Sequence, residues 1–224
     1  MRMKLIERKP IFNDVESFIF EPQEPIQWQP GQYMHYSFPH ESEDDRGHER
    51  WFTISAAPYE NHISITTRFT DKSGSSFKHA LKAMKIGDFI EADGPKGSFL
   101  IDENANRHVL IAGGIGITPY RAQLLQLDHE DKDLSIELFY ANRDENLVFG
   151  QELDKLEKKH PNFHITRFIG DRRIVEADLK PFLDDPQTLF YLSGPRPLVE
   201  NYEHLLKSLG VPEGRIKTDY FPGY

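Results

Sequence analysis

The chain has 224 residues, 38% of them hydrophobic, and a formal net charge of −9. This length is compatible with two globular domains, and the acidic balance disfavours nucleic-acid binding, which needs a basic face for the phosphates. No apolar run approaches the roughly 20 residues of a membrane helix, and no secretory apolar region follows the first residues. We therefore expect a cytoplasmic protein without a membrane span.

Cysteine is absent from the sequence. Disulfides are therefore excluded, and so are zinc sites and iron–sulfur clusters held by thiolates. Histidines such as His35, His40, His48 and His62 are scattered without the spacing of metal ligands. We predict no metal site, and any iron–sulfur centre that serves this chain must lie outside it.

The first hundred residues predict a small antiparallel β-barrel, because short alternating or aromatic-rich segments are separated by Pro, Gly and Asn. We place six strands at about residues 3–9, 15–21, 32–38, 50–55, 61–69 and 88–92. One helix is expected from Ser75 to Met84, where Phe77, Ala80 and Leu81 continue a single apolar face.

After residue 107 the pattern changes to apolar runs joined by helical segments, the clearest being Pro197 to Leu209. Such alternation is typical of βαβ units with a parallel sheet covered on both sides. The runs lie at about 108–112, 134–141, 163–169, 188–193 and 215–221. We predict two domains, 1–103 as the barrel and 104–224 as a Rossmann-like α/β domain with a five-stranded parallel sheet.

Charge is spread unevenly along the barrel half. Glu41, Glu43, Asp44 and Asp45 form an acidic loop, and lysines follow it at 72, 78, 82, 85 and 96. The simplest interpretation is a solvated loop and a solvated helix face. As a set, the lysines would also steer an acidic partner.

In the barrel half, a candidate anion site combines Arg50 with the helix start at Gly74 to Ser76. A guanidinium holds a phosphate bidentately, and a helix N-terminus attracts negative charge. On the same strand as Arg50, Phe52 would pack beside a flat heterocycle and Thr53 would donate to a ring nitrogen. The structural alternatives are an ion pair with Glu49, an ordinary N-cap and a core aromatic residue.

A glycine-rich phrase, Ala112 to Pro119, follows the apolar run at 108–111. A glycine turn between a strand and a helix lets backbone approach a pyrophosphate closely. Pro119 suits the first helical turn, and Thr118 either reaches a ligand or caps the helix. Although Pro119 replaces the third glycine of the G-x-G-x-x-G fingerprint, the position after a parallel strand favours a nucleotide site.

These ordered landmarks resemble the ferredoxin-NADP reductase superfamily of flavoproteins over nearly the whole chain. The matching phrases are Pro30 to Tyr33, Arg50 to Ser55, Gly74 to Ser76, Gly94 to Gly97, Gly113 to Pro119 and Ser193 to Pro195. The resemblance implies an enzyme, a flavin oxidoreductase. It assigns FAD to domain 1–103 and NADH or NADPH to domain 104–224.

The resemblance also implies roles for flavin-binding residues. Arg50 would bind the flavin phosphate, Phe52 would lie against the isoalloxazine ring, and Thr53 would lie near N5. Ring and ribityl contacts would come from Ser55 and the backbone of Thr66, Thr67 and Arg68, and pyrophosphate contacts from Gly74, Ser75 and Ser76. We expect FAD rather than FMN, because the sequence offers binding groups for both phosphates of the flavin pyrophosphate.

For the nucleotide, the resemblance implies binding by Gly113, Gly114, Gly116, Thr118 and Pro119, with Thr118 near the nicotinamide. Ser193, Gly194 and Pro195 stand where the family has Cys-Gly-Pro. Ser193 would keep the cysteine's place beside the reacting carbon. Of the C-terminal aromatic residues, either Phe221 or Tyr224 would cover the flavin, unless the tail is a surface segment.

The choice of nucleotide depends on the loops after the second and third strands of this domain. Arg143 is a candidate for binding the nucleotide. Asp171 would bond a ribose hydroxyl and repel a phosphate, which favours NADH, whereas Arg172 and Arg173 would attract the additional phosphate of NADPH. Between the two nucleotides, the sequence favours NADH over NADPH.

The reaction implied by the family is hydride transfer from the nicotinamide ring to the flavin ring, with the two rings stacked at roughly 3–3.5 Å. Thr53, Thr118 and Ser193 would orient the rings, and the transfer needs no general base. Electrons would then leave to a separate acceptor, a ferredoxin or other iron–sulfur protein that docks on the lysines between 72 and 96. One alternative is a reductase of free flavin, quinone or oxygen. The alternative of another class is a non-catalytic nucleotide-binding interaction module.

Overall fold

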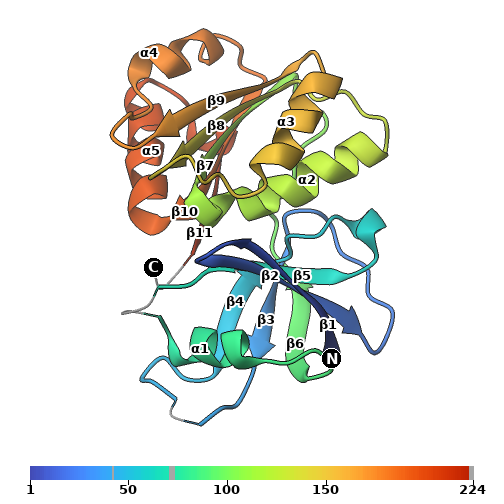
Figure 1. Cartoon of the computed structure of the whole chain (residues 1–224). Coiled ribbons are helices and arrows are strands. Elements are labelled where there is room, and N and C mark those ends of the chain that lie inside the picture. The colour runs from blue at the N-terminus through green and yellow to red at the C-terminus, as the bar shows by residue number, and fades with distance from the viewer. Residues whose placement is uncertain (42, 71–73, 222–224) are drawn as a thin grey trace. The chain divides into compact units, whose positions relative to one another are not determined.

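The computed structural model describes residues 1–41, 43–70 and 74–221, except for the side chain of Phe221. Two compact units divide the chain, Met1–Leu100 and Ile101–Tyr224, and both are drawn in Figure 1. Each unit has a separate hydrophobic core. The described helices include none that is long and apolar enough to span a membrane.

The first unit contains a six-stranded antiparallel sheet in the order β4-β3-β6-β1-β2-β5, which confirms the predicted strands. Its elements are β1 (Arg2–Phe12), β2 (Val15–Pro22), β3 (Tyr33–Ser37), β4 (Glu49–Thr53), the short 3-10 helix η1 (Pro58–Glu60), β5 (Ile63–Arg68), α1 (Ser76–Ala83) and β6 (Phe89–Lys96).

Helix α1 begins where the sequence predicts a helix. The Ser75 hydroxyl caps it by accepting a hydrogen bond from the Lys78 N–H at 3.3 Å. Phe77 and Leu81 are fully buried against the barrel core, beside Met84 at the C-cap. The apolar face therefore holds the helix on the sheet, and polar contacts are made by the N-terminus at Ser76.

The second unit contains a five-stranded parallel sheet in the order β11-β10-β7-β8-β9, as predicted. The strands are β7 (Arg107–Gly113), β8 (Ile136–Asn142), β9 (Phe163–Ile169), β10 (Thr188–Pro195) and β11 (Ile216–Phe221). The helices are η2 (Gly114–Ile117), α2 (Thr118–His129), α3 (Gly150–Lys159), α4 (Glu176–Leu179), η3 (Lys180–Phe182), α5 (Arg196–Ser208) and η4 (Glu213–Arg215).

Helices cover both faces of this sheet, α2 and α3 on one side and α4 and α5 on the other (Figure 1). On the α5 side, Val109 and Phe190 of the sheet share a core with Tyr202 and Leu206 of the helix. Because both faces are buried, the strands read as continuous apolar runs. The carboxyl ends of parallel strands lie at one edge of a sheet, so Gly113, Asn142 and Pro195 come to the same edge.

Candidate functional site

The glycine-rich phrase forms the connection between β7 and α2 at that edge. Gly113 is the last residue of β7, and Gly114 to Ile117 make the 3-10 turn η2. Gly114 has a φ of 52°, in the left-handed region that favours glycine. The Tyr140 hydroxyl donates to the Gly114 carbonyl at 3.1 Å, which fixes the turn against β8.

The three glycines of this turn differ in how closely other atoms pack against them. A Cβ on Gly116 would lie 2.3 Å from the Ser193 carbonyl oxygen, and one on Gly113 would lie 2.6 Å from Leu198 Cδ1. Only on Gly114 would a Cβ keep clear of protein, with Asn142 Oδ1 nearest at 3.7 Å. The sequence interpretation assigned all three glycines to the approach of a pyrophosphate. The structure gives Gly113 and Gly116 a packing reason and leaves Gly114 as the open position.

Thr118 and Pro119 are both buried in the first turn of α2. The Thr118 hydroxyl donates to the Ile115 carbonyl at 3.1 Å, inside the turn. It therefore braces η2, and its oxygen keeps lone pairs with which to accept from a ligand.

The residues proposed to choose the nucleotide follow neighbouring strands. Gly170 N–H donates to the Asn142 carbonyl at 3.0 Å, which brings the loops carrying Arg143 and Asp171 together. Both side chains are exposed. Arg173 donates to the Gly170 carbonyl at 2.6 Å, so this guanidinium is bonded to its own loop.

Ser193 is fully buried in β10, between Ala112 of β7 and Asp219 of β11. Its hydroxyl donates to Asp219 Oδ2 at 3.4 Å. Burial raises the pKa of Asp219 to about 6, partly opposed by the bond from Ser193. The sequence interpretation missed this carboxyl, whose only signal was an acidic residue in an apolar strand.

Asp219→Asn is expected to remove a pH dependence of stability. The folded-state pKa is raised, so the folded chain binds this proton more tightly than the unfolded chain does. Stability from the group is therefore present at low pH and lost as pH rises from about 4 to 6, by up to about 3 kcal/mol. Urea unfolding at pH 4.5 and pH 7 measures it: the wild type should lose more stability than the variant. Equal losses would contradict the prediction.

In the first unit, Arg50 lies on the edge strand β4 beside the helix α1. Its guanidinium Nη1 donates to the carbonyls of Arg46 and Gly47, and Nη2 lies 3.5 Å from Asp44 Oδ1. The predicted alternative of an ion pair with Glu49 is not what forms, because Arg50 contacts the Glu49 carbonyl and pairs with Asp44. Within the described residues Nη2 has no hydrogen-bond partner although it is buried.

The N-terminus of α1 is occupied by Asp44. The Ser76 N–H donates to Asp44 Oδ2 at 2.8 Å, and the Asp44 N–H donates to the Ser76 hydroxyl at 3.0 Å. Arg46 completes the contact, with Nη2 at 2.7 Å from the same oxygen. Asp44 belongs to the acidic loop that the sequence interpretation treated as solvated.

Phe52 and Thr53 extend β4 beyond Arg50. The Phe52 ring is half-buried and packs at 5.8 Å from both Tyr36 and Phe77. Thr53 is buried. Phe52 is therefore a core neighbour with one part exposed, which leaves it able to contact a ring as well as the barrel.

Hydroxyls farther along form an internal network. The Ser55 hydroxyl bonds Ser64 at 2.7 Å and Thr66 at 2.8 Å, and Thr66 bonds Ser17 at 2.7 Å. Flavin contacts from this segment would accordingly use backbone groups. β5 is an edge strand, so one side of the backbone of Thr66 to Arg68 faces away from the sheet.

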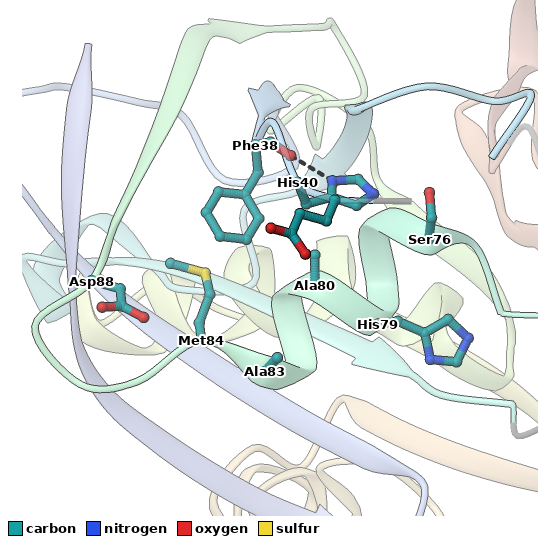
Figure 2. Close-up of a pocket in the computed structure, with 9 residues that line it drawn as sticks. Phe38, His40, Ser76, His79, Ala80, Ala83, Met84 and Asp88 are labelled. Atoms are coloured by element: carbon teal, nitrogen blue, oxygen red, sulfur yellow. Dashed lines mark hydrogen bonds between the residues drawn. The ribbon is translucent and has the colours of Figure 1, made fainter. Parts of the chain in front are cut away.

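A cavity of about 540 Å³ runs along α1 from Ser76. Phe38, Ala80, Ala83 and Met84 contribute apolar lining, and Figure 2 shows His40 and Ser76 near the N-terminal end of α1. The His40 Nδ1 bonds the Phe38 carbonyl at 2.7 Å, while its buried Nε2 has no hydrogen-bond partner in the described part of the chain.

Two other predicted features are only partly described. Phe221 ends β11, opposite Pro195, but its side chain and all of Tyr224 lie outside the described residues. Of the predicted lysine surface, Lys72 also lies outside them. Lys78 donates to the Arg68 carbonyl at 3.0 Å, and Lys96 lies 5.6 Å from the Trp51 ring, so both bind within the unit.

The donors present fit a flavin and a nucleotide. Arg50 Nη2 is buried beside a helix N-terminus and has a long ion pair with Asp44 at 3.5 Å but no hydrogen bond within the described residues, an arrangement that suits phosphate oxygens. The open Gly114 suits close approach by a second phosphate group. Thus each unit has groups at the start of a helix that would suit an anion.

Known proteins match both halves of the chain. A family model described as the oxidoreductase FAD-binding domain matches residues 2–101, and one described as the oxidoreductase NAD-binding domain matches residues 110–204. A solved structure, the flavohem-like FAD/NAD binding domain of nitric oxide dioxygenase from Vibrio cholerae, superposes with a TM-score of 0.84 at 24% identity and covers 98% of each chain.

Curated relatives are longer than this chain. A flavohemoprotein from Rhodopirellula baltica is 28% identical over 92% of this chain and 57% of its own length. The carnitine monooxygenase reductase subunit of Escherichia coli is 29% identical over 80% of this chain and 56% of its own length. The two domain models and the fold show that the chain joins an oxidoreductase FAD-binding domain to an oxidoreductase NAD-binding domain, in the two-domain fold of the ferredoxin-NADP reductase superfamily.

Proposed function

We propose that this chain takes electrons from NADH or NADPH onto FAD and passes them to a separate acceptor, an iron–sulfur protein such as a ferredoxin. Residues 1–103 would bind FAD and residues 104–224 the nucleotide. The observation that carries the proposal is that each unit has a helix start suited to a phosphate. In the first unit Arg50 lies beside the N-terminus of α1, and in the second the open Gly114 precedes α2.

Bound FAD supplies the chemistry, because it accepts two electrons together and releases them one at a time. The residues of the chain bind and orient. In the first unit we assign flavin binding to Arg50, Phe52, Thr53, Ser55, the backbone of Thr66 to Arg68, and Gly74 to Ser76. In the second we assign the nucleotide to Gly114, Thr118, Pro119, Arg143, Asp171 and Ser193 to Pro195, with Gly113 and Gly116 positioning the turn, and we keep Phe221 and Tyr224 as candidates to cover the flavin.

An acceptor outside this chain follows from its composition. The sequence contains no cysteine to hold an iron–sulfur cluster. Relatives include proteins named as a carnitine monooxygenase reductase subunit and a phenoxybenzoate dioxygenase subunit, and the chain spans about half the length of each. Their names support an electron-transfer partner, and we propose that its docking surface includes the exposed Lys82 and Lys85.

The proposal is tested by an anaerobic absorbance spectrum of the purified protein supplied with FAD, before and after one equivalent of NADH and then NADPH. Flavin bands that bleach with either nucleotide are expected, and a reduced ferredoxin should follow when oxidised ferredoxin is added. Protein that binds no FAD would contradict the proposal and favour a non-catalytic interaction module. Bleaching that only free flavin or quinone reverses would favour a small-molecule acceptor.

Asp171→Ala is expected to reduce a preference for NADH over NADPH by roughly tenfold, measured as the ratio of kcat/KM values. The exposed carboxylate repels a phosphate at this edge. Tenfold corresponds to about 1.4 kcal/mol, which lies between the contact energy of two unit charges in bulk water, about 1 kcal/mol, and near a protein surface, about 4 kcal/mol. The matched control is Asp184→Ala, which removes an exposed acid elsewhere on the second unit. An unchanged ratio would remove Asp171 from the nucleotide site.

A further inference from the structure

The carboxylate of Asp44 rests on the donors that a flavin phosphate needs. It accepts from the Ser76 N–H at the start of α1 at 2.8 Å, and Arg50 Nη2 lies 3.5 Å from its other oxygen. Arg46 adds two contacts, from Nη2 at 2.7 Å and from Nε at 3.1 Å. A helix N-terminus combined with guanidinium groups is the donor set that proteins use for phosphates.

Asp44 is an anion at any working pH. The Ser76 N–H, and next the Arg46 guanidinium, hold the pKa of this carboxyl well below its usual range. The loop also places the carboxylate by a second bond, from the Asp44 N–H to the Ser76 hydroxyl at 3.0 Å. The residue is thus fixed on the helix start from both main chain and side chain.

We propose that Asp44 is a competitor built into the flavin site, which sets the affinity for FAD by exchanging with its phosphate at Ser76 and Arg50. The inference rests on the proposed function, because it uses the same donors. One N–H group directed at a carboxylate oxygen cannot serve a phosphate oxygen well, and two anions a few ångströms apart repel. Flavin binding therefore moves Asp44 and the loop that carries it off the helix, while Ser76 and Arg50 stay in place to bind the phosphate.

The alternative is that Asp44 only supports the N-terminus of α1. Asn and Asp are about equally good in such a role, so an amide would preserve the helix. It would not preserve the competition, because hydrogen bonds from charged donors to a carboxylate are about twice as strong as neutral ones. Asp44→Asn therefore separates the two roles.

The experiment measures the FAD dissociation constant of the full chain by fluorescence quenching, for the wild type, Asp44→Asn and Asp45→Asn. Asp45 is the exposed neighbour in the same loop, so its variant makes the same change in net charge. We expect Asp44→Asn to bind FAD about tenfold more tightly and Asp45→Asn to change little, as one charge-assisted contact implies. Equal or weaker FAD binding by Asp44→Asn would overturn the inference while the proposed function stands.

Inorganic pyrophosphate, followed by the shift in thermal midpoint, makes the two proposals separable. If the wild type binds no FAD, the proposed function fails. The exchange then still holds if pyrophosphate stabilises Asp44→Asn more than the wild type and Asp45→Asn. If pyrophosphate stabilises all three equally or none, the exchange is wrong.

Discussion

Gly116→Ala should abolish reduction of the flavin by nicotinamide nucleotide while FAD stays bound. The added Cβ would lie 2.3 Å from the Ser193 carbonyl oxygen and 2.6 Å from Gly194 Cα. These are main-chain atoms of β10, so no side chain can rotate away, and η2 must separate from the sheet. Overpacking lowers the free energy of unfolding by about 1–3 kcal/mol, and we expect the second unit to lose stability at the upper end of that range.

The measurements are NADH-dependent bleaching, FAD content and urea unfolding. The atoms that clash all belong to the second unit, so FAD content should remain at the wild-type level. Gly214→Ala is the matched control, because nothing lies within 4 Å of a Cβ built at Gly214. A Gly116→Ala protein with wild-type stability and bleaching would contradict both the packing argument and the nucleotide assignment.

Arg50→Ala should weaken FAD binding by roughly 10- to 100-fold, since a hydrogen bond to a charged group contributes about 1.5–3 kcal/mol. The loss should not unfold the chain. Among the described residues, Arg50 donates to the nearby carbonyls of Arg46, Gly47 and Glu49, pairs with Asp44 and lies 5.7 Å from the centre of the Phe77 ring. Titration of the apoprotein with FAD measures the affinity, and a thermal scan checks the fold.

Two further variants sharpen this test. Arg50→Lys keeps the charge but loses the planar fork, so its affinity should lie between those of the wild type and Arg50→Ala. Lys9→Ala removes an exposed cation of the same unit, one that pairs with Glu7 at 3.5 Å, and should bind FAD normally. If Arg50→Ala bound FAD as the wild type does, Arg50 would not belong to the flavin site.

Local patterns predicted most of the architecture. Alternation in the first half and apolar runs in the second located all eleven described strands within a few residues, because the period of burial is written directly in the sequence. The helix start at Ser75 could also be predicted from the sequence, since an N-cap is a contact between residues three apart.

Contacts between distant residues could not be predicted in the same way. The exchange of hydrogen bonds between Asp44 and Ser76 joins positions 32 apart, and a charged loop by itself gives no sign of such a partner. The burial of Asp219 likewise could not be predicted, because it depends on the pairing of β11 with β10.

The sequence by itself determined the element order, the two-domain class and the two phrases that we propose to bind phosphates, because each depends on neighbours along the chain. Only the tertiary structure decided what the members of those phrases do. Gly113 and Gly116 are small because Leu198 and β10 press against them, and Gly114 alone is open. Arg50 pairs with Asp44 rather than Glu49 because folding brings the acidic loop onto α1. Sterics and charge pairing between remote segments arise only when the chain packs, so no local pattern encodes them.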